Sequence, residues 1–371
     1  MMIDAAAVSG KLQALLDHLV AEEVHVPGGI LRVNGPSLRW RGASGIAIPE
    51  GNVAMSPDDR FVIDSIGKTM TATIVMKLVE AGRLALDDPI GRHAPSTLLD
   101  GLLDFNRQPF AETVTLRHLL GHASGLADDW NHPGFLDLII ADPKRRWTPE
   151  ETIEYVKRNC DPTFPPGGGF RYSDPGYNLI GLAVEAVAGR PLHVVLREML
   201  LEPLGMDDTY WPSHEEPRPP ATNEQVSRRF LEDMECTLWP AVITANWAGG
   251  ALVSTAEDLD RFFRAFVRGE LFDDPATRDR MLDWRESGPY HDYGFGVSRV
   301  DFDRSPTPGH AGLGEVWGHT GSSHNFMYYW PGVDVTLIGT LNQIVCDRTV
   351  YDTVAAIMRE IRESTDGAPP G

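Results

Sequence analysis

The sequence has 371 residues, of which 42% are hydrophobic and 9% aromatic, with no low-complexity tract, and this composition excludes an extensively disordered chain. Its 53 acidic and 33 basic residues give a formal net charge of −20, which opposes binding to nucleic acid or to an anionic membrane surface. The three scattered cysteines, Cys160, Cys236 and Cys346, form no CxxC pair. They favour free thiols and a reducing compartment, and leave one disulfide plus a free thiol open.

The N-terminus lacks a basic segment followed by an apolar stretch, and no run of 18 apolar residues occurs elsewhere. We therefore expect a cytoplasmic protein without a membrane partner, although a processed secreted form would look the same. The sequence does not indicate an oligomeric state.

Periodicity predicts helices and strands along the chain. The apolar residues Leu12, Leu15, Leu16, Leu19 and Val20 recur at helical spacing. A helix start is indicated at Thr148, where a capping threonine is followed by proline and, three residues on, by Glu151. In chain order, the predicted elements are an N-terminal helix, strands 29–33 and 38–42, a helix 65–81, helices and long loops over 85–215 with one helix at 176–187, strands 326–330 and 333–341, and a helix 350–361.

Strands at both ends of the chain around a helical middle predict an α/β (α+β) fold with a discontinuous sheet domain and a helical insertion. The expected boundaries are 8–64 and 225–363 for the sheet domain, 65–224 for the helical domain and 364–371 for a tail. No internal repeat is present.

The first candidate site motif is Ser65-Ile66-Gly67-Lys68, at the start of a predicted apolar helix. Positions i and i+3 share a helix face, so the hydroxyl and the amine can meet. A serine hydroxyl becomes a good nucleophile when a neighbouring base takes its proton. The chain has five lysines against 28 arginines, and an ordinary lysine would be unusual on this apolar helix.

A second motif, Tyr172-Ser173-Asp174, follows a glycine-rich loop and precedes a predicted helix, so the phenol can project into a cleft. By itself, a tyrosine such as Tyr172 is more often a half-buried residue bonded to the backbone than a catalytic one. The third motif is Trp317-Gly318-His319-Thr320-Gly321-Ser322, where small residues on a strand let a substrate approach closely. A lone histidine on a strand is more often structural than catalytic.

In this order and spacing the three motifs resemble those of the serine β-lactamase and penicillin-binding protein family, which carries Ser-x-x-Lys, Tyr-x-Asn and Lys/His-x-Gly. The similarity is greatest to its branch of class C β-lactamases, DD-peptidases and family VIII esterases. It spans about residues 10 to 363 and includes the stretches Val114–Leu126, Glu202–Thr209 and Gly249–Leu259.

The resemblance implies an antiparallel sheet flanked by the N- and C-terminal helices, packed on a helical domain, with the site between them. It implies a serine hydrolase without cofactor or metal, acting on a small ester or amide. Ser65 would be acylated, Lys68 would activate it, and Tyr172 would protonate the leaving group and help activate the deacylating water. The N–H groups of Ser65 and Ser322 would bind the oxyanion, while the cleft would be lined by His319, Thr320, Gly321 and Trp247.

Two departures from the family pattern bear on function. Asp174 replaces the usual asparagine, and a carboxylate beside Lys68 would hold the lysine protonated unless it turns away or shares a proton. The peptidase branch places an arginine directly after a Gly-x-Gly-x strand, here expected at Gly294–Val297, but Ser298 occupies that place. Arg299 comes one residue later and is expected to face away from the cleft.

Several alternatives remain at this stage. The chain has no Gly-x-Ser-x-Gly elbow of an α/β-hydrolase and no HExxH or HxH zinc motif, so His122, His132 and His310 are expected to be loop or core residues. An acyltransferase, a DD-carboxypeptidase, a weak β-lactamase and an inactive ligand-sensing module would all share the motifs. The substrate itself cannot be read from them.

Overall fold

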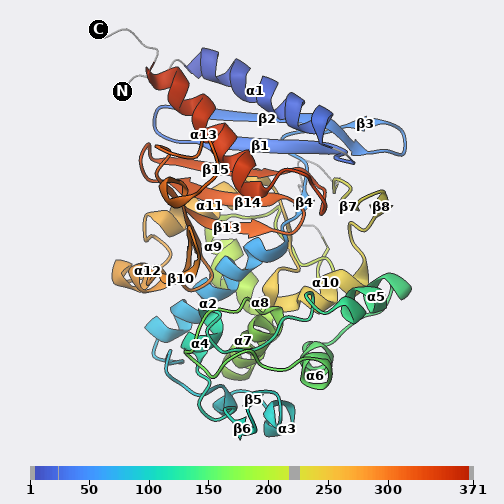
Figure 1. The fold of residues 1–371 in the computed structure, drawn as a ribbon, viewed down its shortest axis with the longest axis vertical. Helices are drawn as coiled ribbons and strands as arrows, with labels where there is room; N and C mark the ends of the chain where they lie inside the picture. The colour runs from blue at the N-terminus through green and yellow to red at the C-terminus, as the bar shows by residue number, and fades with distance from the viewer. Residues whose placement is uncertain (1–4, 24, 217–225, 367–371) are drawn as a thin grey trace.

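The computed structural model describes residues 5–23, 25–216 and 226–366. Within them, a nine-stranded antiparallel sheet forms one layer, and a group of helices lies below it (Figure 1). The strand order is β10-β11-β12-β13-β14-β15-β1-β2-β3. The strands are β1 (Gly28–Asn34), β2 (Arg39–Ile48), β3 (Val53–Ala54), β10 (Arg285–Gly288), β11 (His291–Tyr293), β12 (Ser298–Asp301), β13 (Glu315–Gly321), β14 (Asn325–Trp330) and β15 (Val335–Thr340).

The sheet joins both ends of the chain, because β1 pairs with β15 in the register Ile30↔Thr340 and Leu31↔Gly339. One face is covered by α1 (Ala5–Glu22) and α13 (Val350–Asp366), which lie side by side (Figure 1). Their apolar residues, including Leu12, Leu16 and Ile357, form a core with the outer side chains of the strands. The predicted N- and C-terminal helices are therefore confirmed, and α13 continues to residue 366, into the predicted tail.

The opposite face of the sheet packs on α11 and, beyond it, on the helical region. The largest core cluster is continuous from the sheet into these helices. The helices are α2 (Gly67–Glu80), α3 (Ser96–Leu99), α4 (Leu116–Leu120), α5 (Pro133–Ala141), α6 (Pro149–Asn159), α7 (Asp174–Ala188), α8 (Leu192–Leu196), α9 (Glu202–Leu204), α10 (Pro240–Asn246), α11 (Ala256–Val267) and α12 (Pro275–Met281). Short pairs connect β4 (Phe61–Val62) with β9 (Val253–Ser254), β5 (Asp104–Phe105) with β6 (Gln108–Pro109), and β7 (Phe230–Leu231) with β8 (Met234–Glu235).

The predicted start of α6 has the expected local chemistry. The Thr148 side chain accepts the N–H of Glu151, and the Glu151 carboxylate accepts the N–H of Thr148, which together form a capping box. Pro149 occupies the first helical position, where no hydrogen bond is lost.

The predicted strand over Gly294–Val297 is wrong, because these residues form the turn between β11 and β12. The Gly294 N–H donates to the Val297 carbonyl, and Gly296 has a φ of +69°. A Cβ at Gly296 would lie 2.8 Å from the Lys68 carbonyl oxygen, so glycine lets the turn rest directly on α2. Gly294 and Gly296 allow this close packing, and their Gly-x-Gly-x pattern in the sequence was mistaken for a strand.

Two sequence predictions about cysteines and domains have different outcomes. All three cysteines are free thiols, as their odd and scattered pattern predicted. The division into sheet and helical domains stays a prediction, and its boundary near residues 224 and 225, like residues 367–371 of the tail, lies outside the described residues.

In the described part of the chain, no single helix is long and apolar enough to cross a membrane. The helices Asp174–Ala188 and Leu192–Leu204, which are bent by 77° relative to each other, are together long and apolar enough to do so by length and composition alone. Much of its first helix, α7, is buried in the protein core.

Candidate active site

Ser65 lies in a 3₁₀ turn (Asp64–Ile66) that directly precedes α2, so the helix begins two residues later than predicted. The cause is local: Asp64 has a φ of +48°, and a Cβ at Gly67 would lie 2.8 Å from the Cα of Gly250. The turn nevertheless preserves the expected relation between positions i and i+3. The Nζ of Lys68 lies 3.1 Å from the Oγ of Ser65.

Lys68 is fully buried, and its ammonium group has three partners. It donates to the Oγ of Ser65 and, at 2.9 Å, to the carbonyl of Gly249, and it forms an ion pair with Asp174. A Cβ at Gly249 would lie 3.0 Å from this Nζ, so glycine leaves room for the lysine. The carboxylate at position 174 therefore does not turn away from Lys68.

Tyr172 ends the glycine-rich loop, just before Ser173 caps the N-terminus of α7 by accepting the N–H of Gly176. The Nζ of Lys68 lies 4.9 Å from the centre of the Tyr172 ring. Burial, followed by the charge of Asp174, raises the pKa of Tyr172 well above its ordinary value, with a smaller opposing effect of Ser65. Within the described residues its hydroxyl has no partner of good hydrogen-bond geometry. Tyr172 is thus a neutral phenol with a proton available to donate.

His319 is buried on β13, and its tautomer follows from its two contacts. Its Nδ1 lies 2.7 Å from the carbonyl oxygen of Thr320, which can only accept, so Nδ1 carries the proton. Its Nε2 then accepts from the Tyr293 hydroxyl at 2.9 Å. Burial and the charge of Lys68 lower the pKa of His319 to about 3. The imidazole is therefore neutral and offers no cation for an anionic substrate.

Ser322 lies in the turn between β13 and β14, and it is held near Ser65 by a buried network centred on Asp64. The Asp64 carboxylate accepts from Nη1 of Arg229 at 2.6 Å, from the N–H of Ser323 at 2.9 Å and from Nδ2 of Asn325 at 2.9 Å. The Ser323 hydroxyl also donates to it, at 2.6 Å. The residue before the nucleophile thus ties the 3₁₀ turn to the turn that carries Ser322.

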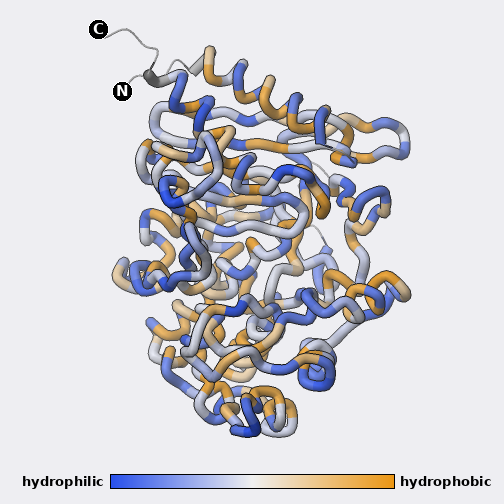
Figure 2. Tube along the Cα trace, in the orientation of Figure 1, coloured by the Kyte–Doolittle hydropathy of each residue, from blue (hydrophilic) through white to orange (hydrophobic). Residues whose placement is uncertain are grey.

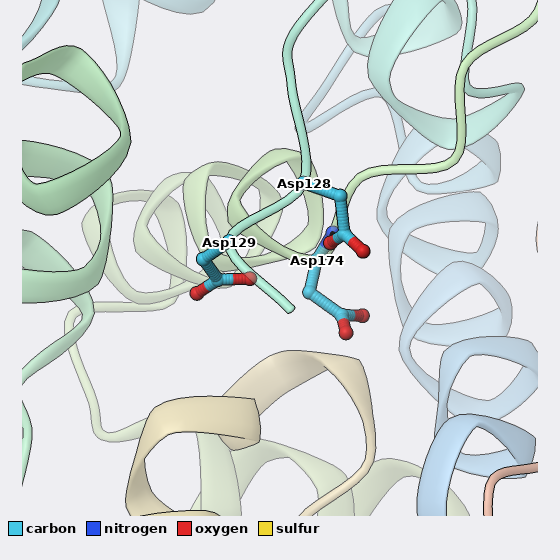
Figure 3. A group of neighbouring side chains, drawn as sticks. All are labelled: Asp128, Asp129 and Asp174. Carbon is cyan, nitrogen blue, oxygen red and sulfur yellow. Dashed lines mark hydrogen bonds between the residues drawn. The ribbon is translucent and has the colours of Figure 1, made fainter. Parts of the chain in front are cut away.

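Three buried carboxylates, Asp128, Asp129 and Asp174, lie together (Figure 3), and Asp174 is the one that pairs with Lys68. One oxygen from each lies within 4.8 Å of the others, so geometry alone would let them hold a cation. Lys68 already supplies a positive charge at Asp174, and Asp128 accepts the Asp174 N–H at 3.0 Å. Burial and the charge of Asp174 raise the pKa of Asp128 to about 7, while burial raises that of Asp129 well above its usual range. Proton uptake therefore offsets part of their negative charge.

Among the described residues, Ser65 lines two cavities, and both are also lined by Tyr172 and Ser322. The first, here called the apolar pocket, has a volume of ≈ 310 Å³ and is lined mainly by Trp130, Leu136, Ile139, Ile140, Leu231, Cys236, Trp239, Val242 and Ile344, with Asp64, Asp128, Asp174, Arg229 and Asn246. The second, here called the polar pocket, has a volume of ≈ 400 Å³ and is lined by Phe170, Ser287, His291, Tyr293, Ser298, His319, Thr320, Gly321 and Tyr351.

The structure thus brings together Ser65, Lys68, Tyr172, Asp174 and residues 319–322 at the end of β13 and the turn after it, all named from the sequence. Trp247 does not meet its expectation as a cleft-wall residue, because it lines neither pocket. Its ring packs against Gly181 and Trp211 at the end of α10, and its place in the chain positions Gly249 under Lys68.

Arg299 faces away from the cleft, as strand alternation predicted. Its guanidinium pairs with Asp292 at 2.7 Å and lies over the Trp284 ring. Ser298 instead lines the polar pocket and donates to the Gly318 carbonyl at 3.1 Å.

Sequence reasoning missed four residues at the site: Asp64, His122, Asp128 and Tyr293. His122 was expected in a loop or core, and it is buried with its ring 4.3 Å from that of Tyr172. The adjacent acids Asp128 and Asp129 lie two and three residues after the end of the quoted family stretch, and they were the one signal available. Tyr293 reaches the site only because β11 and β12 pair it with Ser298.

Comparison with known proteins agrees with this geometry. A sequence profile of the family described as Beta-lactamase matches residues 12–349. The chain belongs to the β-lactamase family. It is accordingly a serine hydrolase of that family with the β-lactamase/transpeptidase-like fold, as predicted from its motifs.

Three relatives illustrate the range of the family. Esterase EstB of Burkholderia gladioli is 29% identical, over 86% of this chain and 88% of its own length. Penicillin-binding protein 4 of Amycolatopsis lactamdurans is 26% identical, over 91% of this chain and 87% of its own. The crystal structure of a D-stereospecific amidohydrolase from Streptomyces sp. superposes with a TM-score of 0.76 at 26% identity, covering 96% of this chain and 98% of that one.

Proposed function

We propose that the protein hydrolyses uncharged small-molecule esters or amides through an acyl-enzyme on Ser65. The observation that carries this proposal is the convergence of Ser65, Lys68 and Tyr172 where two pockets meet. The similarity to an esterase and to an amidohydrolase supports the choice of ester and amide bonds.

In the proposed acylation, the Oγ of Ser65 attacks the substrate carbonyl carbon while Lys68, in its neutral form, takes the hydroxyl proton. The N–H groups of Ser65 and Ser322 stabilise the oxygen that becomes negative. The bond to the leaving group then breaks, and Tyr172 donates a proton to the departing oxygen or nitrogen. Its raised pKa suits it to this donor role.

In deacylation a water molecule attacks the ester carbonyl of acylated Ser65. Its proton passes to the Lys68–Tyr172 unit, and Ser65 recovers a proton as the acid product leaves. All protons in acylation and deacylation are thus supplied and taken up by these side chains and by water. Another nucleophile in place of water would give acyl transfer from the same intermediate.

The test is labelling with a fluorophosphonate, followed by peptide mass spectrometry and by turnover of p-nitrophenyl acetate and a D-alanyl anilide. We expect one adduct on Ser65, and loss of label and turnover in Ser65→Ala. An adduct on another serine with Ser65→Ala still active would refute the mechanism. An unlabelled and inactive wild type would instead favour a ligand-sensing module.

A further inference from the structure

Large hydrophobic side chains exposed on the described surface gather near one mouth of the site. Six such residues exist: Val53, Leu136, Leu138, Ile140, Leu238 and Val345. Leu136 and Ile140 line the apolar pocket, while Leu238 and Val345 directly neighbour two lining residues, Trp239 and Ile344. The rim of this pocket, defined here as Leu136 and Ile140, therefore continues its apolar lining out to the surface.

Helix α5 shows how unusual this surface is. Its buried residues Phe135 and Ile139 pack beside Ala241 of α10, which accounts for one apolar side of the helix. The outer side of a surface helix is ordinarily polar, yet Leu136 and Ile140 are 38% and 40% exposed. They lie four residues apart and so share a face. Figure 2 shows α5 largely in the orange of hydrophobic residues. Exposed apolar patches of this kind mark binding surfaces.

The charge of the pocket wall narrows what can bind. Within the described residues, one arginine and no lysine lines the apolar pocket. This arginine, Arg229, forms an ion pair with Asp64. The group bound there is therefore apolar and carries no negative charge. At ≈ 310 Å³, the cavity is at the small end of ligand pockets, so an elongated group would extend from it onto the rim.

The two pockets suit different parts of an ester. The polar pocket presents the hydroxyl oxygens of Tyr293 and Ser298, which can still accept a hydrogen bond from a leaving group and then from the attacking water. The acyl group stays bonded to Ser65 from the departure of the leaving group until the attack of water, so its pocket needs no polar groups to bind either of them. Building on the proposed function, we infer that the apolar pocket and its rim bind the acyl chain, and that the preferred substrates are esters of elongated, uncharged apolar acids.

The test is the hydrolysis of p-nitrophenyl esters with acyl chains of two, four, eight and twelve carbons, kept below their aggregation limits. We expect kcat/KM to rise by up to about fourfold per methylene buried, and to keep rising beyond the butyrate to the octanoate. Octyl acetate serves as the reversed ester, in which the long chain is in the leaving group. A larger gain in kcat/KM from lengthening the alcohol chain than from lengthening the acyl chain would overturn the acyl assignment.

Three single variants of α5 make the test specific to the rim. Leu136→Ser and Ile140→Ser should each lower the octanoate-to-acetate ratio of kcat/KM by about tenfold. Leu138→Ser is the matched control, because Leu138 is 39% exposed on the same helix but lines a separate groove with Leu98 and Trp147. It should change the ratio less than about twofold.

Two outcomes would overturn the inference. One is a wild-type optimum at acetate or butyrate, and the other is an equal effect of Leu138→Ser. In both cases labelled Ser65 and continued acetate turnover would leave the proposed hydrolase function standing. No turnover at any chain length together with an unlabelled Ser65 would refute both.

Discussion

Asp174 pairs with Lys68 where related enzymes have a neutral asparagine, and this single change sets the charge of the centre. The proposed mechanism needs the amine of Lys68 to take the Ser65 proton, so the carboxylate paired with it bears directly on that transfer. Burial and the charge of Asp174 raise the pKa of the adjacent Asp128 to about 7. Activity should therefore depend on pH through Asp128.

We expect Asp174→Asn to retain the fold and at least about a tenth of the wild-type kcat, because an amide fills the same space. The substitution removes the charge that, after burial, raises the pKa of Asp128, so the limb of the kcat profile that follows Asp128 should move to lower pH. The measurement is kcat from pH 5 to 9 for both proteins. Complete inactivity at every pH would mean that the carboxylate is itself catalytic.

The motif residues were predictable because their chemistry depends on spacing within one local segment. Ser65 and Lys68 are one turn apart, and Tyr172 directly precedes a helix cap. Tyr293 and His122 were not predictable, because strand pairing and ring packing bring them in from distant parts of the chain. Trp247 was misplaced because sequence order fixes its position but not the direction of its ring.

At the scale of elements, the Asp64 network couples the 3₁₀ turn of Ser65 to the β13–β14 turn of Ser322. Arg229 approaches from the segment before β7, so three separated stretches of the chain meet at one buried carboxylate. Neither proposed oxyanion donor can move far without breaking these bonds. We regard Ser323 as a positioning residue that acts through Asp64.

Ser323→Ala tests this coupling by removing one buried hydrogen bond. We expect kcat to fall about five- to twentyfold with KM nearly unchanged, alongside a loss of about 1–3 kcal/mol in the free energy of unfolding. Ser227→Ala is the control, because Ser227 is equally buried and bonds the Arg60 carbonyl away from the pockets. It should lose stability but not kcat. An equal fall in kcat for both variants would show that the effect is merely structural.

The main elements followed from periodicity, which is why α1, α7, β14 and β15 agree with the predicted ranges. The Gly294–Val297 turn did not follow from periodicity. Glycine occurs both in closely approached strands and at positive φ, and only the packing of this segment on α2 shows that it is a turn. The antiparallel sheet was implied by the resemblance, but its strand order was not predicted, since pairing between residues 30 and 340 leaves no local pattern.

At the scale of the whole molecule, two features disfavour anionic substrates. One is the net charge of −20, and the other is the lack of an available cation in the described walls of the apolar and polar pockets. Arg299 is paired with Asp292, Arg229 is paired with Asp64, and His319 is neutral. A substrate with a free carboxylate therefore meets long-range repulsion and finds no counter-charge. Cytoplasmic localisation stays a prediction.

We expect an acyl-D-Ala-D-Ala peptide to be a poorer substrate than its C-terminal methyl ester. The missing charge-assisted contact corresponds to about 1.5–3 kcal/mol, or roughly 10- to 150-fold in kcat/KM. Both substrates are compared at low and high salt, because screening should narrow the gap. A preference for the free carboxylate would contradict this prediction and would point to a cation reaching the cleft in the bound state.

The pairing of β1 with β15 also governs how the chain is made. Asn34 and Thr336 are partners although they lie 302 positions apart. At roughly 5–20 residues per second, the ribosome needs about 15–60 s to deliver the second after the first. During that interval the apolar faces of β1 and β2 lack their final cover, and non-local pairing of this kind is slow once it begins. Slower induction at low temperature, or a chaperone that holds the nascent N-terminal strands, should therefore raise the yield of folded enzyme.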